Sequence, residues 1–185
     1  MKDEELVFEF SSSHDLEILG ELYLKYMHLV YGVCLKYLKN REEAMDAVMQ
    51  IFEKLISDIP KQKIENFRSW LHVVTKNYCL MQLRSMKSED EKLREWMLTT
   101  GIVENEHYVH PLDNEQQETD NLLADCIERL NGEQKECIKR FYYENRCYRE
   151  IAEDLGIDEK KVKSNLQNGK RNLKICIEEK DERDE

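Results

Sequence analysis

Apolar residues recur at every third or fourth position along three stretches in the first half of the chain. These stretches cover 16–38, 41–57 and 67–81, and the recurrence is that of a helix with one apolar face. Because the opposite face of each helix is polar, none is stable alone, and we expect the three to pack together. The apolar pattern weakens beyond Lys87, so it predicts a first helical module over 14–87.

Shorter apolar repeats mark the second half of the chain. They favour a helix over 122–130 that ends at Asn131, a further helix over 137–142, and a long helix from about Glu159. The chain has only six Gly and two Pro, so short turns and many strands are poorly supported. The sequence therefore predicts an all-α fold, with a second small helical module over 122–180.

Charge is distributed unevenly along the chain. The net charge is −11 over 185 residues, yet 88–121 alone carries 2 basic and 10 acidic side chains, a net of −8. The ends, 1–13 and 181–185, are also acidic, whereas both modules are close to neutral. We interpret 88–121 as an acidic linker that joins the two modules. The negative total does not exclude a nucleic-acid partner, because steering depends on local fields.

The composition argues against a membrane or exported protein. No apolar run approaches the ~20 residues of a membrane-spanning helix. The acidic first residues lack the basic start and apolar stretch of a secretory signal. The six cysteines are scattered, with no Cys-x-x-Cys pair, so we expect reduced thiols that act as small apolar residues in a cytoplasmic protein.

An enzyme is disfavoured because the histidines within helical segments, His14, His28 and His72, have no evident nucleophile beside them. His107 and His110 lie in the linker beside acidic residues that could complete a metal site. Such ligands need preorganised geometry. We therefore expect no metal, no cofactor and no catalytic residue.

The segment 148–166 has the pattern of a helix-turn-helix. Ala152 is small where two helices cross, Gly156 permits a left-handed turn, and Val162 packs the second helix onto the first. Asp158 is a natural N-cap for the second helix, which then exposes many lysine and amide donors suited to a major groove. Acidic residues at the start of that helix predict weak DNA binding by this module alone. The alternative is an ordinary helical hairpin with a solvated lysine-rich face.

Two parts of the chain resemble the modules of one protein family. The runs 42–55 (EEAMDAVMQIFEKL) and 67–77 (FRSWLHVVTKN) are similar to region 2 of bacterial RNA polymerase sigma factors, most closely the small extracytoplasmic-function (ECF) class. The run 130–174 is similar to region 4 of the same class. The resemblance covers about 20–87 and 122–178, with both modules in the family's order.

The resemblance implies a sigma factor that binds core RNA polymerase and directs initiation at particular promoters, without catalysis of its own. In the family, the second helix of region 2 docks on a coiled coil of the polymerase's largest subunit. An apolar centre with an acidic rim suits a basic helical partner. The alternative is that Ile51 and Phe52 belong wholly to the core. The expected polymerase-binding residues are Asp46, Met49, Gln50, Ile51, Phe52 and Glu53.

Region 2 of the family also opens the −10 element of promoter DNA and captures an unstacked base, in a loop that the resemblance places around 59–66. The opened strand needs stacking and phosphate contacts to offset the lost base stacking. Phe67 and Trp70 lie on the apolar stripe and fit the core better, whereas Lys76 and Asn77 lie off it. The expected residues that bind −10 DNA are Lys61, Lys63, Asn66, Arg68, Lys76, Asn77 and Arg84.

Region 4 of the family reads the −35 element as a duplex with its helix-turn-helix. By resemblance, a separate anti-sigma protein that covers these surfaces is a further expected partner. The expected residues that bind −35 DNA are Lys160, Lys161, Lys163, Ser164, Asn165, Gln167, Asn168 and Arg171.

Two other classes of protein fit parts of the pattern. A free-standing helix-turn-helix regulator with an N-terminal sensing or dimerisation bundle would bind its duplex tightly by itself, as a dimer matched to half-site spacing. A purely structural helical adaptor would have no effect on DNA. These alternatives differ from a sigma factor in whether DNA binding depends on polymerase.

Overall fold

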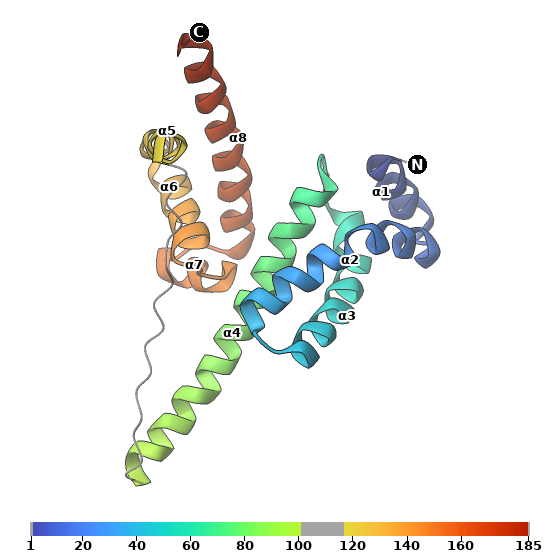
Figure 1. Ribbon diagram of the computed structural model, residues 1–185, viewed down its shortest axis with the longest axis vertical. Coiled ribbons are helices and arrows are strands. Elements are labelled where there is room, and N and C mark those ends of the chain that lie inside the picture. Colours follow the sequence, from blue (N-terminus) through green and yellow to red (C-terminus); the bar gives the residue numbers. More distant parts are fainter. Residues whose placement is uncertain (1, 101–116, 185) are drawn as a thin grey trace. The chain divides into compact units, whose positions relative to one another are not determined.

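The computed structural model describes residues 2–100 and 117–184, and the regular elements within these ranges are all helical (Figure 1). The chain divides into two compact units, Met1–Asp90 and Glu91–Glu185. The predicted all-α fold is confirmed. Each unit is described separately below.

The first unit contains the three predicted helices and one more. Asp15 accepts a hydrogen bond from the backbone N–H of Glu17 (2.9 Å), and Asn40 does the same for Glu42 (2.9 Å), so two side chains set where two of the predicted helices begin. The elements are α1 (Asp3–Ser13), α2 (Leu16–Leu38), α3 (Arg41–Asp58), the 3₁₀ turn η1 (Ile59–Lys61) and α4 (Phe67–Thr100).

The core of the first unit lies where α2 packs against α3. Ala44 and Ala47 are buried, and their small side chains allow the two helices to approach closely. The buried Tyr23 hydroxyl donates to the backbone carbonyl of Val48 at 2.7 Å, which satisfies a polar group inside the core. The apolar stripes read from the sequence are therefore the buried faces of these helices.

Helix α1 extends the core beyond the predicted module. Leu6, Val7 and Phe10 are buried, and α1 packs on α2 and η1. Asp3 accepts a hydrogen bond from the Tyr26 hydroxyl and pairs with Lys25 of α2 at 3.4 Å. From its charge, this segment was expected only to be an acidic end of the chain. The missed signal is the i, i+1, i+4 spacing of its three buried residues.

Helix α4 continues past the end of the predicted first module. It reaches Thr100, and α5 begins at Gln117, so both margins of the predicted linker 88–121 are helical. The residues from Glu91 onward are mostly strong helix formers, which explains the extension despite a weak apolar pattern. The linker's boundaries stay a prediction, and the histidine pair at 107 and 110 lies outside the described residues.

The second unit has the predicted helix-turn-helix. Gly156 has a φ of +66°, Ala152 and Val162 are buried, and Asp158 accepts a hydrogen bond from the backbone N–H of Lys161 at 2.7 Å. The turn, the close crossing and the N-cap are thus confirmed. The elements are α5 (Gln117–Glu128), α6 (Gly132–Ile138), the π-helical turn η2 (Lys139–Tyr143), α7 (Tyr148–Leu155) and α8 (Glu159–Asp184).

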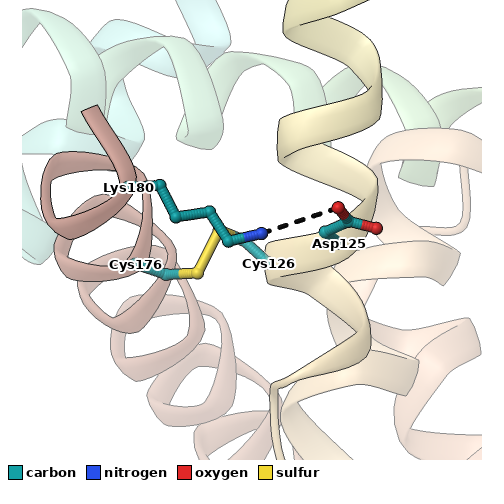
Figure 2. The surroundings of a disulfide bond; sticks show 4 residues. All are labelled: Asp125, Cys126, Cys176 and Lys180. Carbon is teal, nitrogen blue, oxygen red and sulfur yellow. Dashed lines mark ion pairs between the residues drawn. A yellow bond between two sulfur atoms is a disulfide. The ribbon is translucent and has the colours of Figure 1, made fainter. Parts of the chain in front are cut away.

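A disulfide corrects the expectation that all cysteines are reduced. Cys126 of α5 is bonded to Cys176 of α8, with their Cα atoms 5.8 Å apart, and Asp125 pairs with Lys180 beside the bond at 3.5 Å (Figure 2). The two cysteines are separated by 50 positions, so only the packing of α5 on α8 brings them together. The cysteines that are free and buried are Cys34, Cys79, Cys137 and Cys147.

Candidate polymerase and nucleic-acid interfaces

Helix α3 presents a surface that combines apolar and acidic side chains. Met49 is 59% exposed, and Asp46, Gln50 and Glu53 are also exposed. Gln50 accepts a hydrogen bond from the Tyr78 hydroxyl of α4. Four of the six side chains predicted for polymerase binding therefore lie on one exposed side of α3.

Ile51 is placed differently from the prediction. Its side chain is fully buried and lies one helical turn from both Ala47 and Leu55, which are also buried. Phe52 is half-buried, with its ring centroid 5.2 Å from that of Tyr23. Ile51 thus belongs to the core, as the alternative interpretation held, and Phe52 presents only part of its ring.

Met45 is a surface residue that the sequence analysis missed. It is 54% exposed and lies one turn before Met49, so the two thioether side chains form a short apolar stripe beside Asp46 and Glu53. The signal was available, because two methionines at i, i+4 border the core stripe. We call Met45, Asp46, Met49, Gln50 and Glu53 the α3 face.

Three of the five cationic residues predicted to bind −10 DNA lie around the start of α4, with one in η1, one in the loop before α4 and one in the first turn of α4. Lys61, Lys63 and Arg68 are exposed. Asn66 is also exposed, and its side-chain oxygen accepts from the backbone N–H of Ser69 at 2.9 Å, so it caps α4. Three cations therefore lie on the surface around the start of one helix.

An indole hydrogen bond fastens this loop to α4. The Trp70 Nε1–H donates to the side-chain oxygen of Gln62 at 3.1 Å. Phe67 is buried, and its ring centroid lies 5.9 Å from that of Trp70. Phe67 thus lies in the core and Trp70 packs against it, in line with the expectation, and Trp70 also holds the loop through Gln62.

Lys76 corrects the prediction for the middle of α4. Lys76 is only 5% exposed, because the buried band of α4 is broad here and extends beyond one side of the apolar stripe. Asn77 and Arg84 are half-buried. Lys76 therefore does not present its ammonium on the surface as a nucleic-acid contact would require. Its buried neighbours on α4 are Thr75, Cys79 and Leu80.

Helix α8 presents polar and cationic side chains on the side opposite its buried residues Val162 and Leu166. With 3.6 residues per turn, positions 160, 164, 167 and 171 fall along the outward side. Lys163 is half-buried at its edge. We call Lys160, Ser164, Gln167, Asn168 and Arg171, which are all exposed, the α8 face.

The two remaining predicted residues of α8 face a neighbouring helix. Asn165 is half-buried and donates to a carboxylate oxygen of Glu133 in α6 at 3.2 Å, and Lys161 pairs with the other oxygen at 3.1 Å. The hydrogen bond from Asn165 and the ammonium of Lys161 hold the pKa of the Glu133 carboxyl below its usual range. Sequence reasoning missed Glu133, because nothing in the spacing links α6 to α8.

Within residues 2–100 and 117–184, the structure shows neither a metal-binding cluster nor a membrane-spanning helix. These ranges hold no cluster of three or more His, Cys, Asp or Glu side chains arranged to bind a metal ion. None of the helices described there has the length and apolar character needed to cross a bilayer.

Comparison with known families identifies both units. The sigma-70 region 2 model matches residues 22–89, and the sigma-70 region 4 model matches residues 120–173. The chain belongs to the sigma-70 family. Region 2 of this sigma factor thus includes the α3 face and the loop before α4, region 4 includes the α8 face, and the whole of α1 precedes the matched part.

Curated relatives are similar over most of this sigma factor. The "ECF RNA polymerase sigma factor SigK" of Mycolicibacterium vanbaalenii is 22% identical over 172 residues, which are 90% of this chain and 85% of the relative. The "ECF RNA polymerase sigma factor SigL" of Mycobacterium tuberculosis is 25% identical over 176 residues, 91% of this chain and 94% of the relative. The resemblance to the ECF class is confirmed.

Solved structures are also similar to this chain. One is the RsbN–BldN complex, with 18% identity, a TM-score of 0.36 and coverage of 90% of this chain and 96% of that chain. Another is CnrH in complex with the cytosolic domain of CnrY, with 14% identity, a TM-score of 0.39 and coverage of 95% and 97%.

Proposed function

We propose that this sigma factor binds core RNA polymerase through the α3 face and brings it to promoters that the two units recognise together. The loop before α4 engages the opened −10 strand, and the α8 face reads the −35 duplex. The observation that supports this proposal most is the presence of both sigma regions in one chain, each with an exposed surface of suitable chemistry.

The α3 face has the chemistry of a docking site for a basic helix. Its methionines adapt their shape to a partner, and the carboxylates beside them attract lysine and arginine. An apolar centre with a charged rim is the usual anatomy of a protein interface. Polymerase docking therefore does not depend on Ile51, which the core retains.

The two nucleic-acid-binding surfaces, the loop before α4 and the α8 face, each bind weakly when separate. The α8 face carries two cations, Lys160 and Arg171, with Lys163 at its edge, while Asp158 and Glu159 lie at the helix start near any bound phosphates. Few phosphate contacts give low affinity at physiological salt. When polymerase holds both units, binding of one unit to the promoter makes binding of the other intramolecular, so the overall affinity for the promoter rises.

In this function the polymerase performs the catalysis, and the protein acts in the cytoplasm, where the promoter DNA is. By family resemblance, we also propose an anti-sigma partner that covers one or both faces when the factor is inactive. The free-standing regulator is not favoured, because region 2 of the sigma family accounts for the N-terminal bundle.

Replacing Met49 with Asp tests the assignment of the α3 face. Met49 is exposed, so folding should survive, whereas a charge at the centre of an apolar contact is expected to weaken core-polymerase binding about thirtyfold. The measurement is the affinity of the labelled full-length chain for purified core polymerase, with helix content checked by circular dichroism.

Leu16→Asp is the matched control for this substitution. Leu16 is also exposed and apolar, but it lies in the first turn of α2, where an acidic residue suits the helix. We expect it to bind polymerase like the wild type. Equal affinity of Met49→Asp and the wild type would contradict the assignment.

A further inference from the structure

Glu133 spans two residues of the −35 helix with a single carboxylate. One oxygen accepts from the side-chain N–H of Asn165 at 3.2 Å, and the other pairs with the ammonium of Lys161 at 3.1 Å. Lys161 and Asn165 lie one turn apart on α8, so they project to the same side of it. That side faces α6 and borders the α8 face.

We call the contacts of Glu133 with Lys161 and Asn165 the clamp. It joins two closely packed helices, α6 and α8. Glu133 follows Asn131, whose side chain caps α6 by accepting from the backbone N–H of Gln134 at 2.9 Å. A Cβ atom on Gly169 of α8 would lie 3.1 Å from the Ile138 side chain, so α6 and α8 are in close contact. The Gln134 side chain also accepts from Asn172 of α8 at 3.0 Å. The Glu133 backbone is therefore held in position relative to α8.

The clamp changes which cations are available to DNA. In the part of the chain that the structure describes, Lys160, Lys163 and Arg171 form no ion pair, whereas Lys161 is already paired. The Lys161 and Glu133 side chains are 54% and 46% exposed, so a phosphate that approaches Lys161 competes with the Glu133 carboxylate for the ammonium and is repelled by that carboxylate.

We propose that Glu133 sets the strength of −35 recognition by withholding Lys161 and Asn165 from DNA. The inference deepens the proposed function and rests on it. Binding is then carried by the α8 face and Lys163. Because Lys161 is paired with Glu133, region 4 alone binds the duplex weakly and depends on polymerase to occupy the −35 element.

A double-mutant cycle at Glu133 and Lys161 tests this inference. The measurement is the affinity of full-length chain plus core polymerase for a promoter fragment that the wild-type holoenzyme transcribes, over a series of salt concentrations. Glu133→Gln is expected to tighten binding about three- to fivefold and to steepen the salt dependence by about one phosphate contact. Lys161→Ala should change wild-type binding little but abolish the gain of Glu133→Gln.

Glu159→Gln provides the charge control, since it removes one negative charge from α8 without touching Lys161. In this background, Lys161→Ala should still have little effect. If Lys161→Ala weakens binding by the same factor in the wild type and in Glu133→Gln, the inference is overturned while the proposed function stands. If the wild-type holoenzyme fails to bind any promoter fragment, the proposed function falls, and this inference falls with it.

Discussion

Truncating Phe10 to alanine is expected to lower the free energy of unfolding of the first unit by about 3–5 kcal/mol. Phe10 is fully buried in the core that α1 shares with α2, and the truncation leaves a cavity there. Urea unfolding followed by circular dichroism measures the loss, and in a Trp96→Phe background, which leaves Trp70 as the one tryptophan, fluorescence reports on the first unit. The whole of α1 precedes the part matched by the region 2 model, so the experiment tests an element that the family comparison does not cover.

Phe8→Ala is the matched control on the same helix. Phe8 is 74% exposed, and removing its ring should change stability by less than about 0.5 kcal/mol. The contrast between two phenylalanines two positions apart reports on the docking of α1, because helix propensity changes in the same way in both variants. Similar small losses in both would show that α1 does not belong to the core.

Replacing Cys126 and Cys176 together with serine is expected to lower the stability of the second unit by about 4 kcal/mol. The bond joins positions separated by 50 residues, and closing a loop of this length restricts the unfolded chain strongly. Thermal unfolding of the full-length chain, with and without a thiol reductant, measures the effect. The unfolding midpoint of the wild type should fall toward that of the variant when the disulfide is reduced.

The doubly substituted variant is its own control for the reductant. Its remaining cysteines are buried and free, so reductant should not change its midpoint. A wild-type midpoint that stays constant after thiol titration has shown complete reduction would contradict a stabilising role for the bond.

The helices were predictable because their apolar spacing is local. The stripes on 16–38 and 41–57 became α2 and α3 with nearly the same ends, since Asp15 and Asn40 supply the caps. The helix-turn-helix was equally readable, because Gly156 is needed for its left-handed turn. Local spacing did not reveal the disulfide, whose partners meet only through the packing of α5 on α8.

The site residues were predictable only as far as a single helix defines its own faces. Lys76 looked exposed because it lies off the apolar stripe, but the long helix α4 buries a broad band there. Ile51 was expected on the polymerase-binding surface, with the core as the alternative, and the structure buries it fully in the core of the first unit. Glu133 could not be found at all, because its contacts with Lys161 and Asn165 cross between helices 28 or more positions apart.

Run-off transcription by purified core polymerase on genomic fragments tests the central claim most directly. The claim is that two surfaces, each of which binds nucleic acid weakly, give promoter-specific initiation only when both are bound to polymerase. We expect the full-length chain to direct new, discrete start sites with core polymerase, while the chain alone binds the same fragments weakly. Tight, polymerase-independent binding, or no new start sites from a correctly folded chain, would contradict the account.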